Sequence, residues 1–240
     1  MNQVIDTITS HCSIRAFKDQ PISKIQLDAI IASGIAASSS SLLQAVSIIR
    51  VTEQEKRLKL AELAGNQPYV ASAAEFLVFC IDYQRHYTLD NNVHPEFMEL
   101  TLSGAIDAGI MAQNCLLAAE SLQLGGVYIG GLRNSPYEVD QLLELPPYCA
   151  VLFGLCLGHP DQHPQLKPRL SPEVIVHENA YQPLEVGSVK QYDQIMLDYY
   201  QTRSSNSKQQ GWSEQTCNKL AQESRPYMQD YFHCKGLAKK

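Results

Sequence analysis

A short basic segment at 11–17, HCSIRAF, contains three side chains that suit a phosphate group. His11, Ser13 and Arg15 occupy alternate positions in it. Alternate side chains of an extended segment face the same way, so an imidazole, a hydroxyl and a guanidinium could act together on a phosphate or a polarised carbonyl edge. An ordinary solvated basic loop is the alternative.

A second cationic segment, LKPRL at 166–170, has a similar arrangement. Lys167 and Arg169 flank Pro168, whose fixed φ favours an extended backbone and keeps both cations on one side. Because no acidic residue is adjacent to neutralise them, the pair suggests an anion site. A solvated Lys-Pro-Arg turn explains the same residues.

The segment GGVYIGGLRN at 125–134 has two glycine pairs on either side of three apolar or aromatic residues. Glycine lacks a Cβ, so the backbone there can bend sharply or lie in contact with a flat molecule. The alternative is a plain strand at 127–129 between two ordinary turns.

Several other kinds of site are excluded by what the sequence lacks. It has no His-Glu-x-x-His, and prolines interrupt the only close histidine pair, His159 and His163, so we expect no metal site. It also has no Gly-x-Ser-x-Gly or Walker segment, and its glycines do not fit Gly-x-Gly-x-x-Gly. A flat cofactor with a phosphate tail would use the two cationic segments, the serine-rich stretch at 38–41 and the bare backbone, and FMN is such a molecule.

Composition indicates a globular protein. The 240 residues are 45% hydrophobic, enough for a substantial core, and the formal net charge of −6 argues against a broad grip on nucleic acid. The seven cysteines form no Cys-x-x-Cys pair and mostly lie in apolar runs, which is typical of reduced thiols. We expect a cytoplasmic protein with neither a secretion signal nor a membrane span.

The elements that must position these segments follow from local patterns. Ser23 and Gln26 form a capping-box pattern ahead of an apolar-faced helix, and Thr52 with Glu55 repeats that pattern before another. Strands are predicted at 46–51, 75–83 and 150–158, and a long helix with small residues in its first half at 96–123. Pro136, after Ser135, begins a short helix directly after the glycine pairs.

The composition changes after residue 160. A proline-rich stretch follows, which indicates an arm or linker, and then two amphipathic helical patterns near 189–203 and 212–224. We therefore predict a three-layer α+β core at 1–160 and an extension at 161–240 that completes the site and belongs to the same structural domain.

The residues as a set are similar to a known family. HCSIRAF, AASSSSLLQ, GNQPYV, the 125–134 segment, LFGLCLGHPDQ, LKPRL and ESRPY together resemble the FMN-dependent nitroreductase superfamily, in particular its oxygen-insensitive NADPH nitroreductases of type A and the NADPH-dependent flavin reductases of light-emitting bacteria. Each fragment alone is weak, but the combination is specific and spans nearly the whole chain. The resemblance implies a homodimer whose carboxyl-terminal extensions wrap the partner subunits, with one FMN per subunit at the interface.

The resemblance also implies roles for individual residues. In the family, the first cluster and the Lys-Pro-Arg segment hold the phosphate and the pyrimidine edge, and the glycine-flanked strand lies near flavin N5. The FMN-binding pattern falls on His11, Cys12, Ser13, Ile14, Arg15, Ser39, Ser40, Gln67, Tyr69, Tyr128, Ile129, Gly130, Gly131, Lys167, Pro168 and Arg169. Cys12 stands where the family often has arginine, so this chain would hold the flavin with one charge fewer.

The implied activity is an NADPH-dependent, ping-pong, two-electron reduction of nitroaromatics, quinones or free flavin. FMN carries the chemistry, with Arg15 and Gly130 tuning it, so we expect no obligatory general acid. The residues expected to face NADPH or the acceptor are Ser41, Leu42, Arg133, Arg203, Lys208 and Arg225. The main alternative is a flavin carrier that delivers reduced FMN to a partner luciferase or monooxygenase; a non-enzymatic nucleotide-binding scaffold is a second alternative.

Overall fold

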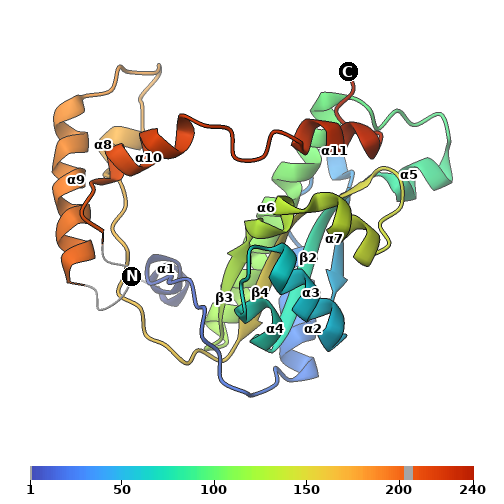
Figure 1. Ribbon diagram of the computed structural model, residues 1–240, viewed down its shortest axis with the longest axis horizontal. Helices are drawn as coiled ribbons and strands as arrows, with labels where there is room; N and C mark the ends of the chain where they lie inside the picture. Colours follow the sequence, from blue (N-terminus) through green and yellow to red (C-terminus); the bar gives the residue numbers. More distant parts are fainter. Residues whose placement is uncertain (1, 203–207) are drawn as a thin grey trace. The chain divides into compact units, whose positions relative to one another are not determined.

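A computed structural model describes residues 2–202 and 208–240 (Figure 1). Contacts group these residues into two compact units, one made of 1–164 with 225–240 and the other of 165–224. The carboxyl-terminal 16 residues therefore return to the first unit. The predicted division at residue 160 stays a prediction.

The first unit is built on a four-stranded sheet of order β1-β2-β4-β3, in which every neighbouring pair is antiparallel. An irregularity between Phe79 and Cys80 shifts the register of β2 against β4. The strands are β1 (Val46–Arg50), β2 (Glu75–Asp82), β3 (Gly125–Ile129) and β4 (Cys149–Gly158). These bounds confirm the three strands predicted from apolar runs, and the middle of the glycine-rich segment is also a strand.

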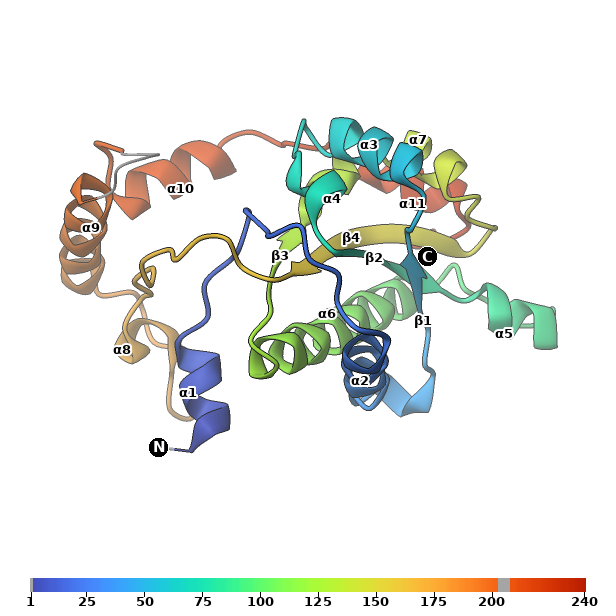
Figure 2. The ribbon, with the colours of Figure 1, turned by 90° about the horizontal axis from the view of Figure 1, so that it is seen from below.

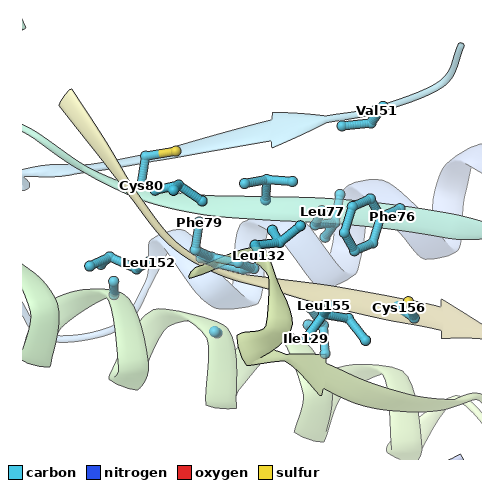
Figure 3. Packing of buried hydrophobic residues seen from close by; sticks show 14 of the residues in the cluster. Val51, Phe76, Leu77, Phe79, Cys80, Ile129, Leu132, Leu152, Leu155 and Cys156 are labelled. Atoms are coloured by element: carbon cyan, nitrogen blue, oxygen red, sulfur yellow. The ribbon is translucent and has the colours of Figure 1, made fainter. Parts of the chain in front are cut away.

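Helices cover both faces of this sheet, which makes three layers (Figure 2). On one face lie α2 (Lys24–Ile35) and the long α6 (Met98–Ser121); on the other lie α3 (Gln54–Leu63), α4 (Tyr69–Ser72), α7 (Pro136–Leu142) and α11 (Met228–Cys234). Because both faces are covered, seven of the eight residues of β2 are buried, and Figure 3 shows its side chains packed against those of β4 and Leu132. Phe79 stacks on Phe153 with ring centroids 5.3 Å apart.

The first residues of the helices show which of the predicted capping patterns form. Ser23 and Gln26 form the predicted capping box at the start of α2. The box predicted for Thr52 and Glu55 is wrong, because Glu53 is the N-cap residue of α3 and makes no capping hydrogen bond. α7 begins at Pro136 as predicted, although Ser135 makes no side-chain cap.

One side of α6 is apolar and exposed. Met98, Leu102, Ile106 and Ile110 follow one another at intervals of four residues and are 55, 51, 53 and 41% exposed. Such spacing puts them on a single stripe of the helix. By length and composition α6 could cross a membrane, with a mean hydropathy of 1.2, but its opposite side packs on α2 and the sheet.

The carboxyl-terminal segment is held in the first unit by buried polar contacts. The Tyr231 hydroxyl accepts a hydrogen bond from Val151 N at 3.0 Å and donates to Asp140 Oδ1 at 3.1 Å. Lys235 Nζ donates to Asp140 and to the Leu145 carbonyl. Tyr231 is fully buried, and burial raises the pKa of its hydroxyl well above the ordinary value. It therefore stays protonated as a donor.

The second unit has a small core of its own. It contains α8 (Pro172–Ile175), α9 (Val186–Gln201) and α10 (Trp212–Leu220). Tyr192, Met196 and Tyr200 recur every four residues on α9 and are buried together, with Leu170 and Trp212 packed against them. The two amphipathic helices predicted for this region are confirmed. The remaining elements belong to the first unit and are α1 (Gln3–Thr9), η1 (Ser40–Leu42), α5 (Gln84–Leu89) and η2 (Gly130–Asn134).

Candidate functional site

The 11–15 segment runs beside β3 and the end of α6. Ile14 is buried, and its amide donates to the Gly126 carbonyl at 3.0 Å, which fixes the segment against the strand. His11 Nδ1 lies 2.5 Å from Glu120 Oε1, while Arg15 is exposed. The imidazole thus already has an acidic partner, and Arg15 remains the exposed cation of this segment.

A cavity of about 540 Å³ adjoins the same segment. Its lining includes His11, Cys12, Glu120 and His163. The Cys12 thiol lies 3.6 Å from the Pro164 carbonyl, within hydrogen-bonding range for sulfur. Cys12 therefore takes part in the wall of this cavity from the position where the resemblance expects an arginine.

The structure accounts for three of the four glycines at 125–131 by packing alone. A Cβ on Gly125 would lie 2.5 Å from Ile14 Cγ1, and one on Gly126 would lie 2.6 Å from the Cys156 carbonyl oxygen. At Gly131 it would collide with the Ala64 carbonyl and the Gln67 amide. Gly130 differs, because its nearest neighbour would be Arg133 Nη2 at 3.5 Å, an ordinary contact. Nothing in the fold explains the missing side chain at Gly130.

Gln67 and Tyr69 lie beside Gly131. The Gln67 amide donates to the Ala64 carbonyl at 2.6 Å, and the Tyr69 hydroxyl donates to Gln67 Oε1 at 2.5 Å. The turn before them uses positive φ at Gly65 (88°) and Asn66 (57°), and Gly65 directly follows Ala64, the C-cap residue of α3. The fold therefore brings Gln67, Tyr69 and Gly131 together.

Two arginines expected near NADPH or the acceptor lie at the other end of η2. Arg225 donates two hydrogen bonds to Asn134 Oδ1, at 3.0 and 2.7 Å. Arg133 donates to the Leu152 carbonyl of β4, and burial followed by the charge of Arg225 lowers the pKa of its guanidinium. The Arg133 side chain is thus bound to a main-chain carbonyl of β4, whereas Arg225 is half-buried and bound to Asn134.

Tyr128 points away from this group toward α6. Its hydroxyl donates to Gln113 Oε1 at 3.2 Å, and its ring meets Phe153 edge-on at 5.6 Å between centroids. Burial raises the pKa of the Tyr128 hydroxyl well above its ordinary value. Ile129, the next residue, is fully buried.

The serine-rich stretch forms a tight loop around Asp107 of α6. Asp107 is only 5% exposed and accepts hydrogen bonds from the Ser39 hydroxyl at 2.7 Å and from Ser40 N at 3.0 Å. Ser41, Leu42 and Gln44 have φ values of 48, 55 and 53°, a left-handed conformation that costs free energy in residues with a Cβ.

Arg85 and His86 also hold the end of that loop. Arg85 Nη1 donates to the Gln44 carbonyl at 2.9 Å, and His86 Nε2 lies 2.8 Å from the Leu43 carbonyl. Leu42 stands 75% exposed at the outer side of the loop. The protein thus stabilises a strained backbone that presents Leu42.

The fold does not bring this loop to the 11–15 segment within one chain. Asp107 holds the loop and Glu120 holds His11, and these two acids are thirteen residues apart on α6. At 1.5 Å per residue they are separated by about 20 Å along the helix. Within the chain, Ser39, Ser40, Ser41 and Leu42 therefore form a group separate from the 11–15 segment.

The Lys-Pro-Arg segment lies in the second unit. Arg169 Nη1 donates to the Lys167 carbonyl at 2.8 Å, and the Tyr192 hydroxyl donates to the Pro168 carbonyl at 3.0 Å. Lys167 Nζ lies 5.8 Å from the centroid of the Tyr200 ring. Lys208 Nζ lies 5.5 Å from the same ring, and Arg203 falls outside the described residues.

The ion pairs of the described residues leave the expected phosphate-binding cations unneutralised. None of these pairs includes Arg15, Lys167, Arg169 or Lys208. Across 2–202 and 208–240, no group of three or more His, Cys, Asp or Glu side chains could hold a metal ion. The arrangement suits anions rather than cations.

Sequence reasoning missed Asp107, Glu120 and Asn134, which hold the functional segments in place. Asp107 carried a usable signal, since it is the single charged residue in the small and apolar stretch SGAIDAGI. A lone acid in such a stretch must find buried hydrogen-bond donors. Glu120 and Asn134 have no comparable local signal.

Comparison with known proteins decides the family. Residues 8–99 and 101–159 match the model of the nitroreductase family, and 167–240 match that of the nitroreductase family C-terminal domain. The chain belongs to the nitroreductase family. The predicted family and its α+β fold are confirmed.

Individual nitroreductase relatives cover the whole chain. It is 61% identical to the NADPH-flavin oxidoreductase of Vibrio harveyi over 100% of both chains, and 47% identical to the oxygen-insensitive NADPH nitroreductase of Salmonella typhimurium over 99% of both. Among solved structures, nitroreductase A from Vibrio parahaemolyticus superposes with a TM-score of 0.96 at 60% identity, covering 100% of both chains. This nitroreductase therefore has full-length relatives in both sequence and fold.

Proposed function

We propose that the chain is an NADPH-dependent oxidoreductase that uses bound FMN for two-electron reduction of free flavin, nitroaromatics or quinones. The proposal is supported by family membership and by relatives named NADPH-flavin oxidoreductase, oxygen-insensitive NADPH nitroreductase and FMN reductase (NADPH). Within this chain, the observation that best supports the proposal is the uncovered backbone at Gly130. A ping-pong cycle follows, because one face of the cofactor serves NADPH and the acceptor in turn.

The residues present fit FMN. A Cβ at Gly130 would clash with no neighbouring atom, so packing does not explain the glycine. The uncovered backbone at this position suits contact with a flat ring. Gln67 and Tyr69 place an amide and a hydroxyl beside the same turn, able to meet polar ring edges. Arg15 and Lys167 have no acidic partner among the described residues and suit a phosphate or a negatively charged ring edge.

When bound, FMN accepts a hydride from NADPH and supplies two electrons to the acceptor. The protein's own contribution is placement and charge. Gly130 would admit the ring, the Gln67 amide would orient it, and Arg15 would stabilise negative charge that develops on it. No side chain is required as a general acid, so acceptor protons come from water.

We infer that the working unit is a homodimer in which the extension at 161–240 wraps the partner subunit. The Ser39–Leu42 group lies about 20 Å along α6 from the residue that holds His11, so one flavin would meet both groups only when a second copy supplies one of them. The exposed stripe of Met98, Leu102, Ile106 and Ile110 gives this second copy an apolar surface to cover.

The dimer is tested by placing a charge on that stripe. Ile106→Asp should shift the protein from dimer to monomer in size-exclusion chromatography with light scattering and weaken FMN retention. Leu58→Asp, at a residue 55% exposed on α3 across the sheet, is the matched control and should remain dimeric. A wild-type protein that is monomeric at micromolar concentration would contradict the proposal.

We also propose that the protein is cytoplasmic. Cys80, Cys115, Cys149 and Cys156 are buried thiols, as expected for a protein from a reducing compartment. Fractionation of the native cell, followed by detection of the protein, would test this location.

The activity is tested with the purified protein. It should be yellow, bleach when NADPH is added without oxygen, and recover its colour when a nitroaromatic, a quinone or free FMN is added. Steady-state rates with these three acceptors rank them. A protein that remains colourless after incubation with FMN would overturn the proposal, and one that releases reduced FMN faster than it reduces any acceptor would favour the flavin carrier.

A further inference from the structure

Arg57 is a buried cation of α3 that has no part in the proposed function. It is 7% exposed and shares the core-facing side of the helix with Leu60 and Ala61. Burial lowers the pKa of its guanidinium, although an arginine stays protonated in a protein. Among the ion pairs of 2–202 and 208–240, none includes Arg57, and Glu75, an acid whose charge acts on it, is paired with Arg50 at 2.6 Å.

The donors of Arg57 go to the end of α4. Its Nε donates to the Val70 carbonyl at 3.0 Å, and its Nη2 donates to the Ala73 carbonyl. The last carbonyls of a helix have no partner inside it, and a helix of one turn, such as α4, gains little from its own hydrogen bonds. Because a guanidinium presents its donors in a rigid plane, one side chain can hold both carbonyls at once.

The segment at 67–73 is thereby attached to α3 at both of its ends. At its start, Gln67 N donates to the Ala61 carbonyl of α3 at 3.0 Å. Val70, whose carbonyl Arg57 binds, donates through its own N to the Gln67 carbonyl at 3.0 Å. The main chain at Gln67 is therefore linked to Arg57 through a single residue.

The same segment carries two polar side chains that depend on each other. The Tyr69 hydroxyl donates to Gln67 Oε1 at 2.5 Å, and the Gln67 amide donates to the Ala64 carbonyl at 2.6 Å. A Cβ on Gly131 would collide with that amide, so Gln67 lies directly against the glycine-rich segment. A small shift of α4 would move the amide and the hydroxyl together relative to Gly131.

A buried arginine costs free energy that an apolar residue would not. Taking a guanidinium out of water is expensive, and neutral carbonyl partners offset only part of that cost. The other buried positions of α3, Leu60 and Ala61, are apolar, so packing alone gives no reason for a charge at Arg57. What the arginine adds is a fixed placement of the end of α4 against α3.

We propose that Arg57 is a positioning residue for the flavin, because by holding the carbonyls at the end of α4 it fixes where the Gln67 amide and the Tyr69 hydroxyl stand. The proposal rests on the proposed function, in which these two groups meet the polar edges of FMN. Arg57 acts through the 67–73 segment and needs no contact of its own with the ligand.

The test compares Arg57→Met with Arg57→Lys in the full-length apoprotein by fluorescence titration with FMN. A methionine keeps apolar volume without a donor, so Arg57→Met should weaken FMN about tenfold, which corresponds to one hydrogen bond of a charged group. A lysine keeps the charge but lacks the planar fork, so Arg57→Lys should fall between. Lys59→Met, which removes a half-exposed cation of the same helix, is the matched control and should stay within about twofold of wild type.

Three further measurements separate positioning from a general loss of stability. Gln67→Ala should weaken FMN in the wild-type background and have little further effect in Arg57→Met, because both changes remove the same contact with the ligand. At saturating FMN, the visible absorption bands of Arg57→Met should match those of Gln67→Ala instead of wild type. Amide hydrogen exchange in the Arg57→Met apoprotein should accelerate at Val70 and stay unchanged at Val78, which is fully buried in β2.

Three outcomes would overturn the proposal: unchanged FMN affinity in Arg57→Met, fully additive effects of Arg57→Met and Gln67→Ala, or wild-type absorption bands in saturated Arg57→Met. The failure of the proposed function is a different result. A wild-type protein that binds no FMN removes that function and this proposal together, whereas wild-type binding with unchanged affinity in Arg57→Met removes this proposal alone.

Discussion

The carboxylate of Asp107 accepts a hydrogen bond from the Ser39 hydroxyl at 2.7 Å, although the two residues are 68 positions apart. The Ser39 hydroxyl in turn accepts from Gln44 N at 2.7 Å, so one buried acid stabilises both ends of the loop. Three residues of this loop have positive φ, and their strain must be offset by such contacts. Asp107 is therefore the residue on which the loop's conformation depends.

Replacing Asp107 should release the loop. Asp107→Ala leaves Ser40 N and the Ser39 hydroxyl without their acceptor, and we expect a loss of about 2–3 kcal/mol in the free energy of unfolding. Urea unfolding measures this loss, and amide hydrogen exchange at Ser40 and Gln44 should accelerate. Asp107→Asn keeps one acceptor oxygen and should fall between. Unchanged exchange at both amides in Asp107→Ala would contradict the explanation.

The two neighbouring glycines at 130 and 131 should respond differently to alanine. In Gly131→Ala the new Cβ meets the Ala64 carbonyl, part of the backbone, so the apoprotein should lose about 1–3 kcal/mol of stability. In Gly130→Ala the Cβ has room, with its nearest contact at 3.5 Å, so stability should change by less than about 0.5 kcal/mol while FMN binds more weakly. Urea unfolding of apoprotein and fluorescence titration with FMN measure the pair. Full FMN affinity in Gly130→Ala would argue against a flavin at this position.

The cysteines should divide into reactive and protected thiols. Burial raises the pKa of the Cys115 thiol to about 11 and that of the Cys156 thiol further, while Cys217 and Cys234 are exposed. Because the thiolate is the reactive form, a Cys12→Ser variant treated with an aromatic disulfide reagent at pH 8 should label two thiols quickly. The other four should react only after urea is added. Rapid labelling of more than two thiols would show that the core opens readily.

Tyr83 should make the fold sensitive to alkaline pH. Burial, followed by the charges of Asp107 and Glu99, raises the pKa of its hydroxyl from 10.0 to about 12. Below pH 10 the group is protonated in both states; above it the unfolded chain loses the proton first, so stability falls as pH rises, by about 1 kcal/mol at pH 11. Tyr83→Phe should remove that part of the slope.

The same substitution has a separate cost at neutral pH. The Tyr83 hydroxyl donates to the Leu100 carbonyl at 2.8 Å, and losing this bond should cost about 1 kcal/mol. Urea unfolding at pH 8 and pH 11 separates the two effects. An identical pH slope in Tyr83→Phe and wild type would show that other groups carry the alkaline response.

Elements whose signals are local were predictable. The apolar run at 75–83 becomes β2 because helices cover both of its faces, and the Ser23–Gln26 box starts α2 because both capping bonds lie within one turn. The Thr52–Glu55 box failed for a related reason. A capping box forms only if the helix begins directly after the Ser or Thr of the pattern. In α3 the N-cap residue is Glu53 instead of Thr52, so the box does not form.

The site was only partly predictable. The phosphate-type segments and the glycine pairs could be identified from residue types, and the family resemblance indicated which residues to examine. What the glycines do was not readable, because Gly125, Gly126 and Gly131 owe their missing Cβ to atoms elsewhere in the chain and only Gly130 is left open. The partners of Ser39 and His11 likewise lie on a helix far along the sequence.

The sequence by itself determined the main strands and helices and the kinds of side chain offered to a ligand, because periodicity, capping and local residue spacing act over a few positions. Its segments taken together also resemble the family to which the chain belongs. Only the tertiary structure decided which of these side chains stand together: Asp107 with Ser39, Glu120 with His11, and Tyr200 with both Lys167 and Lys208. Contacts of that range depend on how each element's buried face packs, and no local pattern encodes the packing partner.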